Sequence, residues 1–588
     1  MNIFKRKYYD KSEMSLPKRS QPPKGITRNK LKHKNIKPLN AVKQKLNFNQ
    51  AAVTAPGIVH RILTKMGYGP TPDLVAYVQS LPGADDTQKV NAYIDEQLDP
   101  ASIDDSIVDA QLTNGYQTLN KTRMQLFQEH YRRPDGMDID WQYRVLPGFE
   151  TFYATTLKAT QSKRQLLEMM ADFWHNHFNV YMDADGIPPM FVHYDRDIIR
   201  ADALGNFRSM LEGVTKATCM LDYLGNAYNH KDAPNENYAR EILELHTISA
   251  KNYLGHMAPE DVPIDAQGRK TGYVEADVVE MARALTGWSY SGADYEANST
   301  GEFLYRDTWH DKGVKTVMGN DYAFNVATPE SDVLEILDRL AEHPATSEFL
   351  AKKLCKRFIS DNPSVTIIDA VKTTLHDNWQ QPDQIKLAME TLLKSNEFLT
   401  TWGEKIKRPY ERVTSAMRQI GFSYDFDPTN NMSDDLFWSF YNSGQMPFYW
   451  TSPNGYPDNK KDWLSSSSIM STWRYIQLIT QLHDDYDESK PNFNDILAIT
   501  FAQFPNAADR TANNLVDYWF QRACGFLPDT AMRDKLADFM ATLDYTNPVP
   551  SDRDSAIDFS LEEWPSYNQE RLFAMVTMIL LTSEFNYR

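Results

Sequence analysis

Cysteine is scarce in this chain, which contains only Cys219, Cys355 and Cys524. No two of them stand at the spacing of metal ligands, and three thiols cannot form a closed set of disulfides. Cys355 falls within an apolar helical pattern, which favours a small core side chain. The cysteines therefore exclude a disulfide framework and a thiolate-bound metal.

Long apolar runs and several familiar active-site motifs are also missing. No run approaches about 18 apolar residues, so the sequence predicts no membrane-spanning helix. It contains no dinucleotide-binding glycine pattern, no phosphate loop and no nucleophile elbow. Residues 1–7 are basic, but no apolar segment follows them, so no secretory signal is predicted. The compartment is therefore unknown from the sequence.

Negative charge dominates the chain, but its distribution is uneven. The formal net charge is −17. Residues 1–50 hold 14 Lys and Arg against only Asp10 and Glu13, which leaves 48 basic and 77 acidic residues for the rest. Such a basic, polar tail cannot bury a core, so we predict that it is disordered, and it is the part that could contact an anionic partner. The acidic body argues against nucleic-acid binding across the main surface.

Apolar residues recur at helical spacing along most of the chain, for example over residues 165–174, 207–214 and 275–285. Residues 289–325 are instead rich in Gly, Ser, Tyr and Asp and contain short extended runs, which predicts a hairpin or a long ordered loop. The predicted fold is therefore all-α, mostly helical and bundle-like, with a small extended or hairpin excursion near 289–325.

The same patterns divide the chain into four predicted regions. They are a basic disordered tail (1–50), an N-terminal helical region with the His and Glu clusters (51–288), a Gly- and aromatic-rich excursion (289–330) and a C-terminal helical region (331–588). Within the last region, residues 425–465 are rich in Pro and Trp, which predicts a long loop.

Two dense polar clusters stand out among the helical patterns. Residues 173–179 contain two histidines, and residues 235–246 combine carboxylates, an arginine and an imidazole. Carboxylates three residues apart are a feature of metal sites in helical bundles. We therefore predict metal ligation by His175, His177, His246 and Glu241, and catalytic roles for Glu241, Glu244 and Arg240. The alternative is a buried Glu–Arg–Glu network that only ties helices together.

The metal interpretation places a condition on the first cluster. His175 and His177 would point about 200° apart on a regular helix, so they could share a metal only if the helix ended near Trp174. Otherwise both histidines would be hydrogen-bonded within a polar core. We expect the two clusters to converge on a pocket near Trp174, Trp288 and His310, because unpaired polar groups in a core are costly.

Further candidates lie in loops and among the aromatic residues. His310 and Asp311 occupy the Gly-rich excursion, where they could act in proton transfer or simply pin the loop. Four aromatic side chains are predicted to contact substrate, with packing between helices as the alternative: Trp174, Trp288, Trp450 and Tyr456.

The order of these landmarks resembles the bacterial "domain of unknown function 1800" family, from about residue 56 to the C-terminus. The matching stretches include residues 60–71, 173–180, 234–241, 282–288, 343–346, 407–409, 453–457 and 583–585, together with His310, Asp311 and Lys315. The resemblance implies a mostly helical fold and a bacterial origin. Members often look exported, but the family has no agreed activity.

Taken together, these features predict a metal-assisted enzyme, hydrolytic or oxidative, that acts on a polymer or a modified peptide. Its expected cofactor is a divalent or transition metal ion. The competing hypothesis is a non-catalytic scaffold or surface-assembly protein whose buried Arg, Glu and His residues only specify how its helices pack.

Overall fold

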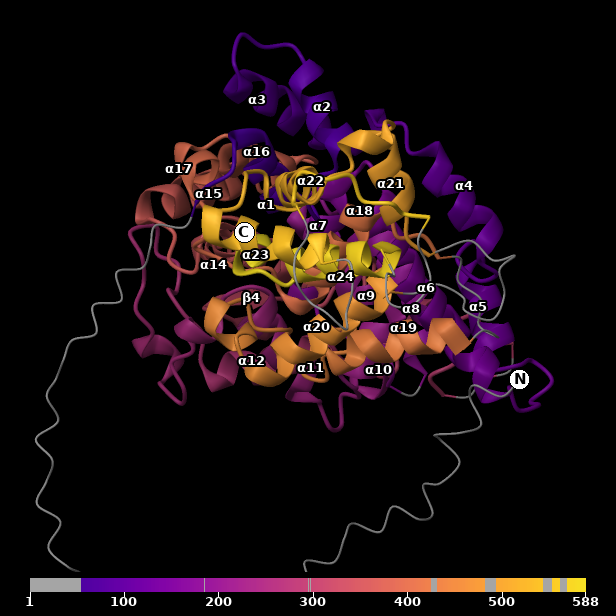
Figure 1. Ribbon diagram of the computed structural model, residues 1–588. Coiled ribbons are helices and arrows are strands. Elements are labelled where there is room, and N and C mark those ends of the chain that lie inside the picture. The colour runs from indigo at the N-terminus through magenta and orange to yellow at the C-terminus, as the bar shows by residue number, and fades with distance from the viewer. Residues whose placement is uncertain are drawn as a thin grey trace, which may run out of the picture.

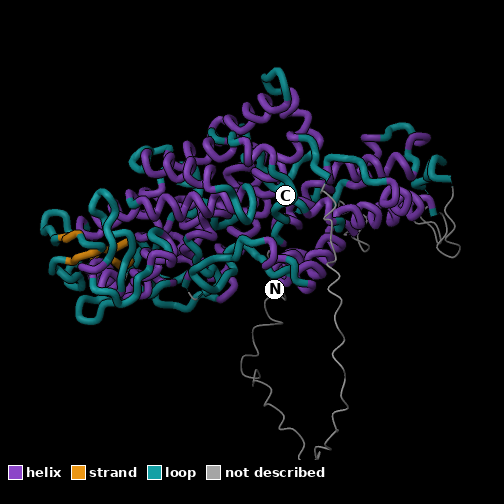
Figure 2. The backbone as a smooth tube through the Cα atoms, turned by 90° about the vertical axis from the view of Figure 1, so that its left-hand side faces the viewer, coloured by secondary structure: helices purple, strands orange, loops and turns teal. Residues whose placement is uncertain are grey.

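The computed structural model describes residues 54–588 except 185, 295, 297, 425–430, 482–492, 543–551 and 561–567. The predicted disordered tail over residues 1–50 therefore lies outside the described residues. Helices make up most of the described chain (Figure 1), and the strands gather at one end of an elongated body (Figure 2). The all-α prediction is confirmed.

The α-helices before the first strand are α1 (Ile58–Met66), α2 (Pro72–Ser80), α3 (Asp86–Gln97), α4 (Ser106–Gly115), α5 (Arg123–His130), α6 (Trp141–Gln161), α7 (Gln165–His177), α8 (Ile187–His193), α9 (Phe207–Lys216), α10 (Thr218–Tyr223), α11 (Glu236–Glu241) and α12 (Glu275–Ala284). Two π-helical segments, η2 (Tyr194–Ile199) and η4 (Ile242–His246), directly continue α8 and α11.

The α-helices after the strands are α13 (Ser331–Glu342), α14 (Pro344–Phe358), α15 (Val365–Asp377), α16 (Gln384–Leu393), α17 (Asn396–Thr400), α18 (Pro409–Ile420), α19 (Asn431–Asn442), α20 (Ser466–Gln481), α21 (Ile496–Gln503), α22 (Ala512–Cys524), α23 (Thr530–Ala541), α24 (Asn568–Leu580) and α25 (Ser583–Asn586). Short 3-10 turns are η1 (Pro100–Ser102), η3 (Asn226–Tyr228), η5 (Ala250–Asn252), η6 (Pro259–Asp261), η7 (Lys460–Trp463) and η8 (Ala507–Asp509).

The predicted excursion forms two small antiparallel hairpins. Strand β1 (Trp288–Tyr290) pairs with β2 (Phe303–Tyr305), with Ser289 opposite Leu304. Strand β3 (Lys315–Val317) pairs with β4 (Asn320–Tyr322), and the two are joined by Met318 and Gly319. The extended runs therefore form strands, as predicted, and β3 packs against α12.

Helix α18 lies at the centre of the molecule, and all twelve of its residues are buried. It packs against α6 on one side and α20 on another, and α20 in turn packs against α24. Gly421 ends α18 in the left-handed conformation, at φ 63°, which glycine adopts without steric cost. Because α18 has no exposed side, its charged residues must all find partners within the protein.

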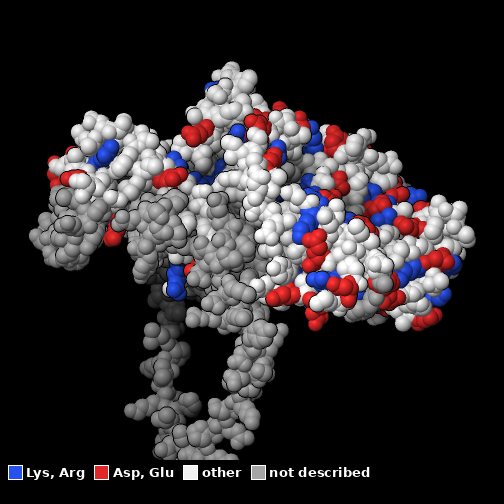
Figure 3. Space-filling view, turned by 90° about the vertical axis from the view of Figure 1, so that its right-hand side faces the viewer, with Lys and Arg blue, Asp and Glu red and all other residues white. Residues whose placement is uncertain are grey.

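Buried apolar residues from Val59 to Phe585 form one hydrophobic core. Helix α13 shows how a typical helix joins it, because Val333, Ile336, Leu337 and Leu340 recur at helical spacing and are all buried. No helix among the described residues is both long and apolar enough to cross a membrane. Acidic and basic side chains lie side by side on the face seen in Figure 3.

Helix α19 corrects part of the loop predicted over residues 425–465. It spans Asn431–Asn442 because Leu436, Phe437 and Phe440 place an apolar stripe against the core. Residues 425–430 lie outside the described residues. The proline-rich stretch after Asn442 does form a loop, with only a 3-10 turn at its end.

That loop is anchored to the end of α7. Asn176 donates from Nδ2 to the carbonyl oxygen of Tyr456 at 3.0 Å and accepts from its backbone N–H at 2.6 Å. Asn179 donates to the carbonyl oxygens of Trp450 and Ser452 at 2.9 and 2.8 Å. The anchor requires glycine at Gly455, where a Cβ would lie 2.1 Å from the carbonyl oxygen of Asn176.

We expect Gly455→Ala to destabilise the protein by about 3 kcal/mol, because it combines left-handed backbone strain with a backbone clash. Gly136→Ala is the matched control. Gly136 has the same φ of 71°, but nothing lies within 4 Å of its Cβ position, so the cost should be about 1 kcal/mol from strain alone. Urea unfolding of both variants measures the difference, and equal losses would show that the loop does not need this close approach.

Candidate functional site

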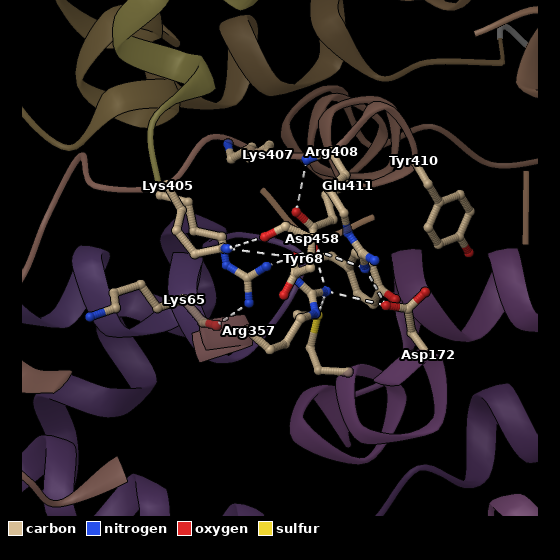
Figure 4. Close-up of polar contacts among 12 residues, drawn as sticks. Lys65, Tyr68, Asp172, Arg357, Lys405, Lys407, Arg408, Tyr410, Glu411 and Asp458 are labelled. Carbon is tan, nitrogen blue, oxygen red and sulfur yellow. Dashed lines mark hydrogen bonds and ion pairs between the residues drawn. The ribbon is translucent and has the colours of Figure 1, made fainter. Parts of the chain in front are cut away.

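A dense group of charged side chains surrounds Glu411 (Figure 4). Its carboxylate contacts Arg357, Arg588 at 2.6 Å and Arg408 at 3.4 Å. Asp172 completes the group by pairing with Arg408 and, at 3.2 Å, with Arg357. We call these five residues the arginine cluster. It connects α7, α14, α18 and Arg588.

Glu411 is ionised at every ordinary pH. Burial alone would raise its pKa, but Arg357, Arg588 and Arg408 hold that pKa well below its usual range. Neighbouring lysines extend the cluster. Lys405 pairs with Asp361 at 3.0 Å, and burial lowers the pKa of Lys407 to about 7. The sequence analysis missed these residues, although 407–409 was one of the matching stretches.

Glu411→Gln should destabilise the protein by about 3–5 kcal/mol, because it leaves buried arginines without a counter-charge. The matched control is Glu212→Gln. Glu212 also pairs with two cations, Arg208 at 2.8 Å and Lys216 at 2.9 Å, but its side chain is 33% exposed, so the loss should stay below about 1 kcal/mol. Thermal and urea unfolding measure both, and similar losses would contradict a central role for Glu411.

His175 belongs to a different buried network. Its Nε2 lies 2.9 Å from Asp195, which also binds Arg200 at 2.8 Å, and Arg200 continues to Glu168 at 2.8 Å. Burial would raise the pKa of Asp195, but Arg200 and His175 hold it below its usual range. Asp195 lies in the π-helical segment η2. His175 is thus paired with a carboxylate that the sequence analysis did not identify.

His177 and His246 do come together, as predicted for the two clusters. Their ring centroids are 6.2 Å apart, and Nε2 of His177 lies 3.1 Å from the carbonyl oxygen of His246. Nδ1 of His177 lies 2.8 Å from Nζ of Lys353. The His246 ring nitrogens are buried without a hydrogen-bond partner, and burial lowers the pKa of this imidazole to about 3.

The predicted four-ligand metal site of His175, His177, His246 and Glu241 does not form. Helix α7 runs on to His177 instead of ending near Trp174, so the two histidines of this helix face different partners. No group of three or more His, Cys, Asp or Glu among the described residues could hold a metal ion. The existence of a metal cofactor stays a prediction, but this ligand set does not support it.

His310 and Asp311 pin the excursion to its neighbours. His310 is fully buried, and its Nδ1 donates to the carbonyl oxygen of Thr286 at 2.7 Å while Nε2 lies 3.0 Å from Asp332. Lys315 pairs with the same carboxylate at 2.7 Å. Asp311 pairs with Arg283 of α12 at 2.9 Å. These contacts favour the loop-pinning alternative, and they place His310 in a cluster separate from His177 and His246.

The buried Glu–Arg–Glu network considered as the alternative does not form around Arg240. Arg240 instead binds Glu275, with one contact at 3.1 Å, and Glu236 at 3.3 Å. Glu236 is its i−4 neighbour, and Glu275 begins α12, which packs against α11. This ion pair is partly exposed, so Arg240 does not neutralise two buried carboxylates.

Glu241 and Glu244 are consequently left without a hydrogen-bond donor among the described residues, and both are half-buried. Burial and the charge of Glu244 raise the pKa of Glu241 to about 7, against the opposing effect of Arg240. Glu241 ends α11, and Glu244 lies in the π-helical segment η4. Such wide turns within helices are frequent at functional sites.

Two tyrosines adjoin this carboxylate pair. The Tyr273 hydroxyl is buried without a hydrogen-bond partner, and burial together with the charge of Glu244 raises its pKa. Burial and the charge of Glu241 raise the pKa of Tyr223 to about 12. The Tyr223 hydroxyl donates to the carbonyl oxygen of Thr451 at 3.0 Å, so this tyrosine contacts the loop that carries Trp450 and lies close enough to Glu241 to sense its charge.

Of the four aromatic candidates, Trp174 and Trp288 are core residues. Both are fully buried, with Trp174 donating to the carbonyl oxygen of Ala203 and Trp288 packed against Phe303, so neither can face a substrate. Trp450 is half-buried, and its ring lies 4.9 Å from that of Tyr456. Tyr456 is half-buried as well and donates from its hydroxyl to the carbonyl oxygen of Met446, so Trp450 and Tyr456 are the two partly exposed aromatic candidates.

The Glu241 carboxyl should make stability depend on pH. Its folded pKa of about 7 lies above the value of about 4.3 for an unfolded chain. The protonated group therefore adds stability below about pH 4, and this stability is lost as pH rises through about 7.

Glu241→Gln should remove that loss. Relative to the unchanged protein, the variant should gain about 1–2 kcal/mol between pH 5 and pH 8, after allowance for solvent screening of a half-exposed group. Urea unfolding at both pH values measures the gain. Glu236→Gln, in the exposed first turn of the same helix, serves as the control and should show no such gain. A pH-independent difference for Glu241→Gln would contradict the raised pKa.

Comparison with known proteins gives a family and nothing more. The family model described as "Protein of unknown function (DUF1800)" matches residues 61–587. No curated protein and no solved structure matches this chain.

Proposed function

The chain belongs to the DUF1800 family, whose description names no activity. We therefore propose a function from the site itself. The protein is an enzyme that hydrolyses a polymer by acid–base catalysis at Glu241 and Glu244. One observation carries the proposal. Glu241 is a half-buried carboxyl, without a hydrogen-bond donor among the described residues, whose pKa is raised to about 7. Structural carboxylates of this protein, such as Glu411, are held by several cations instead.

A carboxyl with this pKa is suited to proton transfer at neutral pH. About half of such groups are protonated at pH 7, so the same side chain can donate a proton to a leaving group and later accept one from water. Glu244 supplies the second carboxylate, and a pair of carboxylates is the usual arrangement for cleaving glycosidic bonds. The buried Tyr273 hydroxyl has no hydrogen-bond partner and lies close enough to Glu244 to sense its charge, so it is a further potential donor.

The surroundings favour an extended, ring-bearing substrate. Tyr223, which senses the charge of Glu241, donates to Thr451 of the loop that carries Trp450, and a partly exposed indole can stack on a sugar or an aromatic ring. We therefore name a polysaccharide as the first substrate class to test, with a modified peptide as the second. In the metal-assisted form of the proposal, the two carboxylates would also supply oxygen ligands for a divalent cation.

The test is a cleavage assay with the full-length chain on a panel of polysaccharides and peptides, which scores new reducing ends and new amines. Glu241→Gln should lower the rate at least about 100-fold, as expected when a general acid is lost. Glu236→Gln should leave the rate unchanged. If Glu241 is the acid, the rate should fall as pH rises above about 7. Retention of activity in Glu241→Gln, or no cleavage of any substrate in the panel, would contradict the proposal.

Addition and removal of divalent cations decide between the two forms of the mechanism. If a chelator abolishes cleavage and Mg²⁺, Mn²⁺ or Zn²⁺ restores it, the metal-assisted form holds. Unchanged cleavage in the presence of chelator supports acid–base catalysis by the side chains alone.

A scaffold role is the second candidate, and the arginine cluster favours it. Five charged residues from distant parts of the sequence are used there to fix helix packing, which gives a rigid body suited to assembly. This role predicts that Glu241→Gln has no effect on any assay other than the pH dependence of stability.

A further inference from the structure

Lys353 and His177 form a hydrogen-bonded pair outside the carboxylate site. Lys353 lies on α14, and its Nζ is 2.8 Å from Nδ1 of His177 at the end of α7. The side chain of Lys353 is partly exposed, whereas His177 is buried. A lysine normally presents its ammonium group to water or to a carboxylate, so an imidazole partner for a half-buried lysine is unusual.

The hydrogen bonds fix which nitrogen of His177 carries the proton. Nε2 lies 3.1 Å from the carbonyl oxygen of His246, which can only accept, so Nε2 must be the donor. Burial and the nearby Lys353 hold the pKa of His177 well below its usual range, so the ring is neutral. Nδ1 therefore carries a lone pair directed at Nζ of Lys353.

This arrangement has the parts of an activated nucleophile. The amine is the nucleophile, Nδ1 of His177 is the base within hydrogen-bond reach, and the carbonyl oxygen of His246 orients the base. The His246 carbonyl is available because it lies at the end of the π-helical segment η4, where the last carbonyls have no partner within the helix.

The surroundings keep the amine poorly solvated. The rings of Phe349 and Phe173 lie 5.3 and 6.0 Å from Nζ of Lys353. Besides His177, the titratable groups that act on this amine are His246 and Asp458. Burial lowers the pKa of Lys353 to about 8, although Asp458 acts in the opposite direction. A neutral amine is thus present at a pH where exposed lysines are almost wholly protonated.

We propose that Lys353 is a reactive amine that forms an imine with aldehyde- or ketone-bearing compounds, with His177 as its proton acceptor. The flanking phenylalanine rings favour carbonyl compounds with a flat, apolar body. The inference does not depend on the carboxylate pair, since it uses other side chains and a different reaction.

The chemistry needs no oxidant or reductant. Nζ of Lys353 attacks the carbonyl carbon with its lone pair, so a C–N bond forms, and the first of the two amine protons passes to the carbonyl oxygen, which becomes a hydroxyl group. Nδ1 of His177 takes the second amine proton and delivers it to that hydroxyl, which leaves as water while the nitrogen lone pair forms the C=N bond. A carbonyl compound and the amine thus give an imine and one water molecule.

Reductive trapping tests the proposal on the full-length chain. Benzaldehyde and cyanoborohydride are added at pH 7, and peptide mass spectrometry follows alkylation of each lysine over time. Lys251 is the reference, because its side chain is 73% exposed. Lys353 should react at least about tenfold faster, since a pKa near 8 instead of 10.4 raises the neutral fraction about 200-fold at this pH. A rate at Lys353 no higher than at Lys251 would overturn the proposal.

Two controls separate the proposed activation from other causes. His177→Asn keeps a polar group beside Lys353 but removes the base, so alkylation of Lys353 should fall at least about fivefold, while Lys251 is unaffected. An unchanged rate at Lys353 would contradict the role of His177. Lys407 is 4% exposed and should stay unmodified. Equal labelling of Lys407 and Lys353 would show that only opened chains react, which also contradicts the proposal.

If circular dichroism shows that His177→Asn does not fold, the pH dependence of alkylation in the unchanged protein still tests the proposal. The alkylation rate of Lys353 should then rise with a midpoint near pH 8, in line with its lowered pKa. A midpoint near 10, the usual range for lysine, would overturn the proposal.

Discussion

The burial of Glu411 at the start of the central helix is the constraint on which the rest of the structure depends. A carboxylate removed from water is costly unless cations and hydrogen bonds replace its hydration. Here the replacement comes from α14, from the residue before α18 and from Arg588. Arg588 also donates to the carbonyl oxygen of Lys65 in α1 at 2.6 Å. Helices from both ends of the chain must therefore assemble around one carboxylate, and the apolar core closes over the result.

The same requirement explains where the other polar residues lie. His175 is satisfied by Asp195 and Arg200, and His310 by Thr286 and Asp332. Each of these groups joins an excursion or a helix to its neighbour. Arg240 is likewise used by Glu275 and Glu236. The polar richness of the two sequence clusters thus serves several separate sites instead of one.

Much of the fold could be predicted from the sequence, because apolar spacing determines which face of a helix is buried. The pattern at Val333, Ile336 and Leu340 predicts α13, and the extended runs near residue 303 predict a hairpin. Side-chain partners were harder to predict, because they depend on which helices meet. Glu275 is 35 residues from Arg240, and Glu411 is 177 residues from Arg588. Whether α7 continues to His177 stayed open in the sequence, because the polar run at 175–177 lacks a signal that distinguishes a buried helix end from a loop.

Buried polar groups that have partners and those that lack them lead to different conclusions about function. Where a buried charge has several partners, as Glu411 has, its position is explained by packing alone. Glu241 and Glu244 have neither a cation in contact nor a hydrogen-bond donor among the described residues, and the burial of Glu241, together with the charge of Glu244, makes the folded chain less stable at neutral pH. Groups of this kind are frequent at functional sites, where the cost in stability is offset by a proton-transfer group with a suitable pKa. A purely structural role would give no reason to keep two such carboxylates one turn apart.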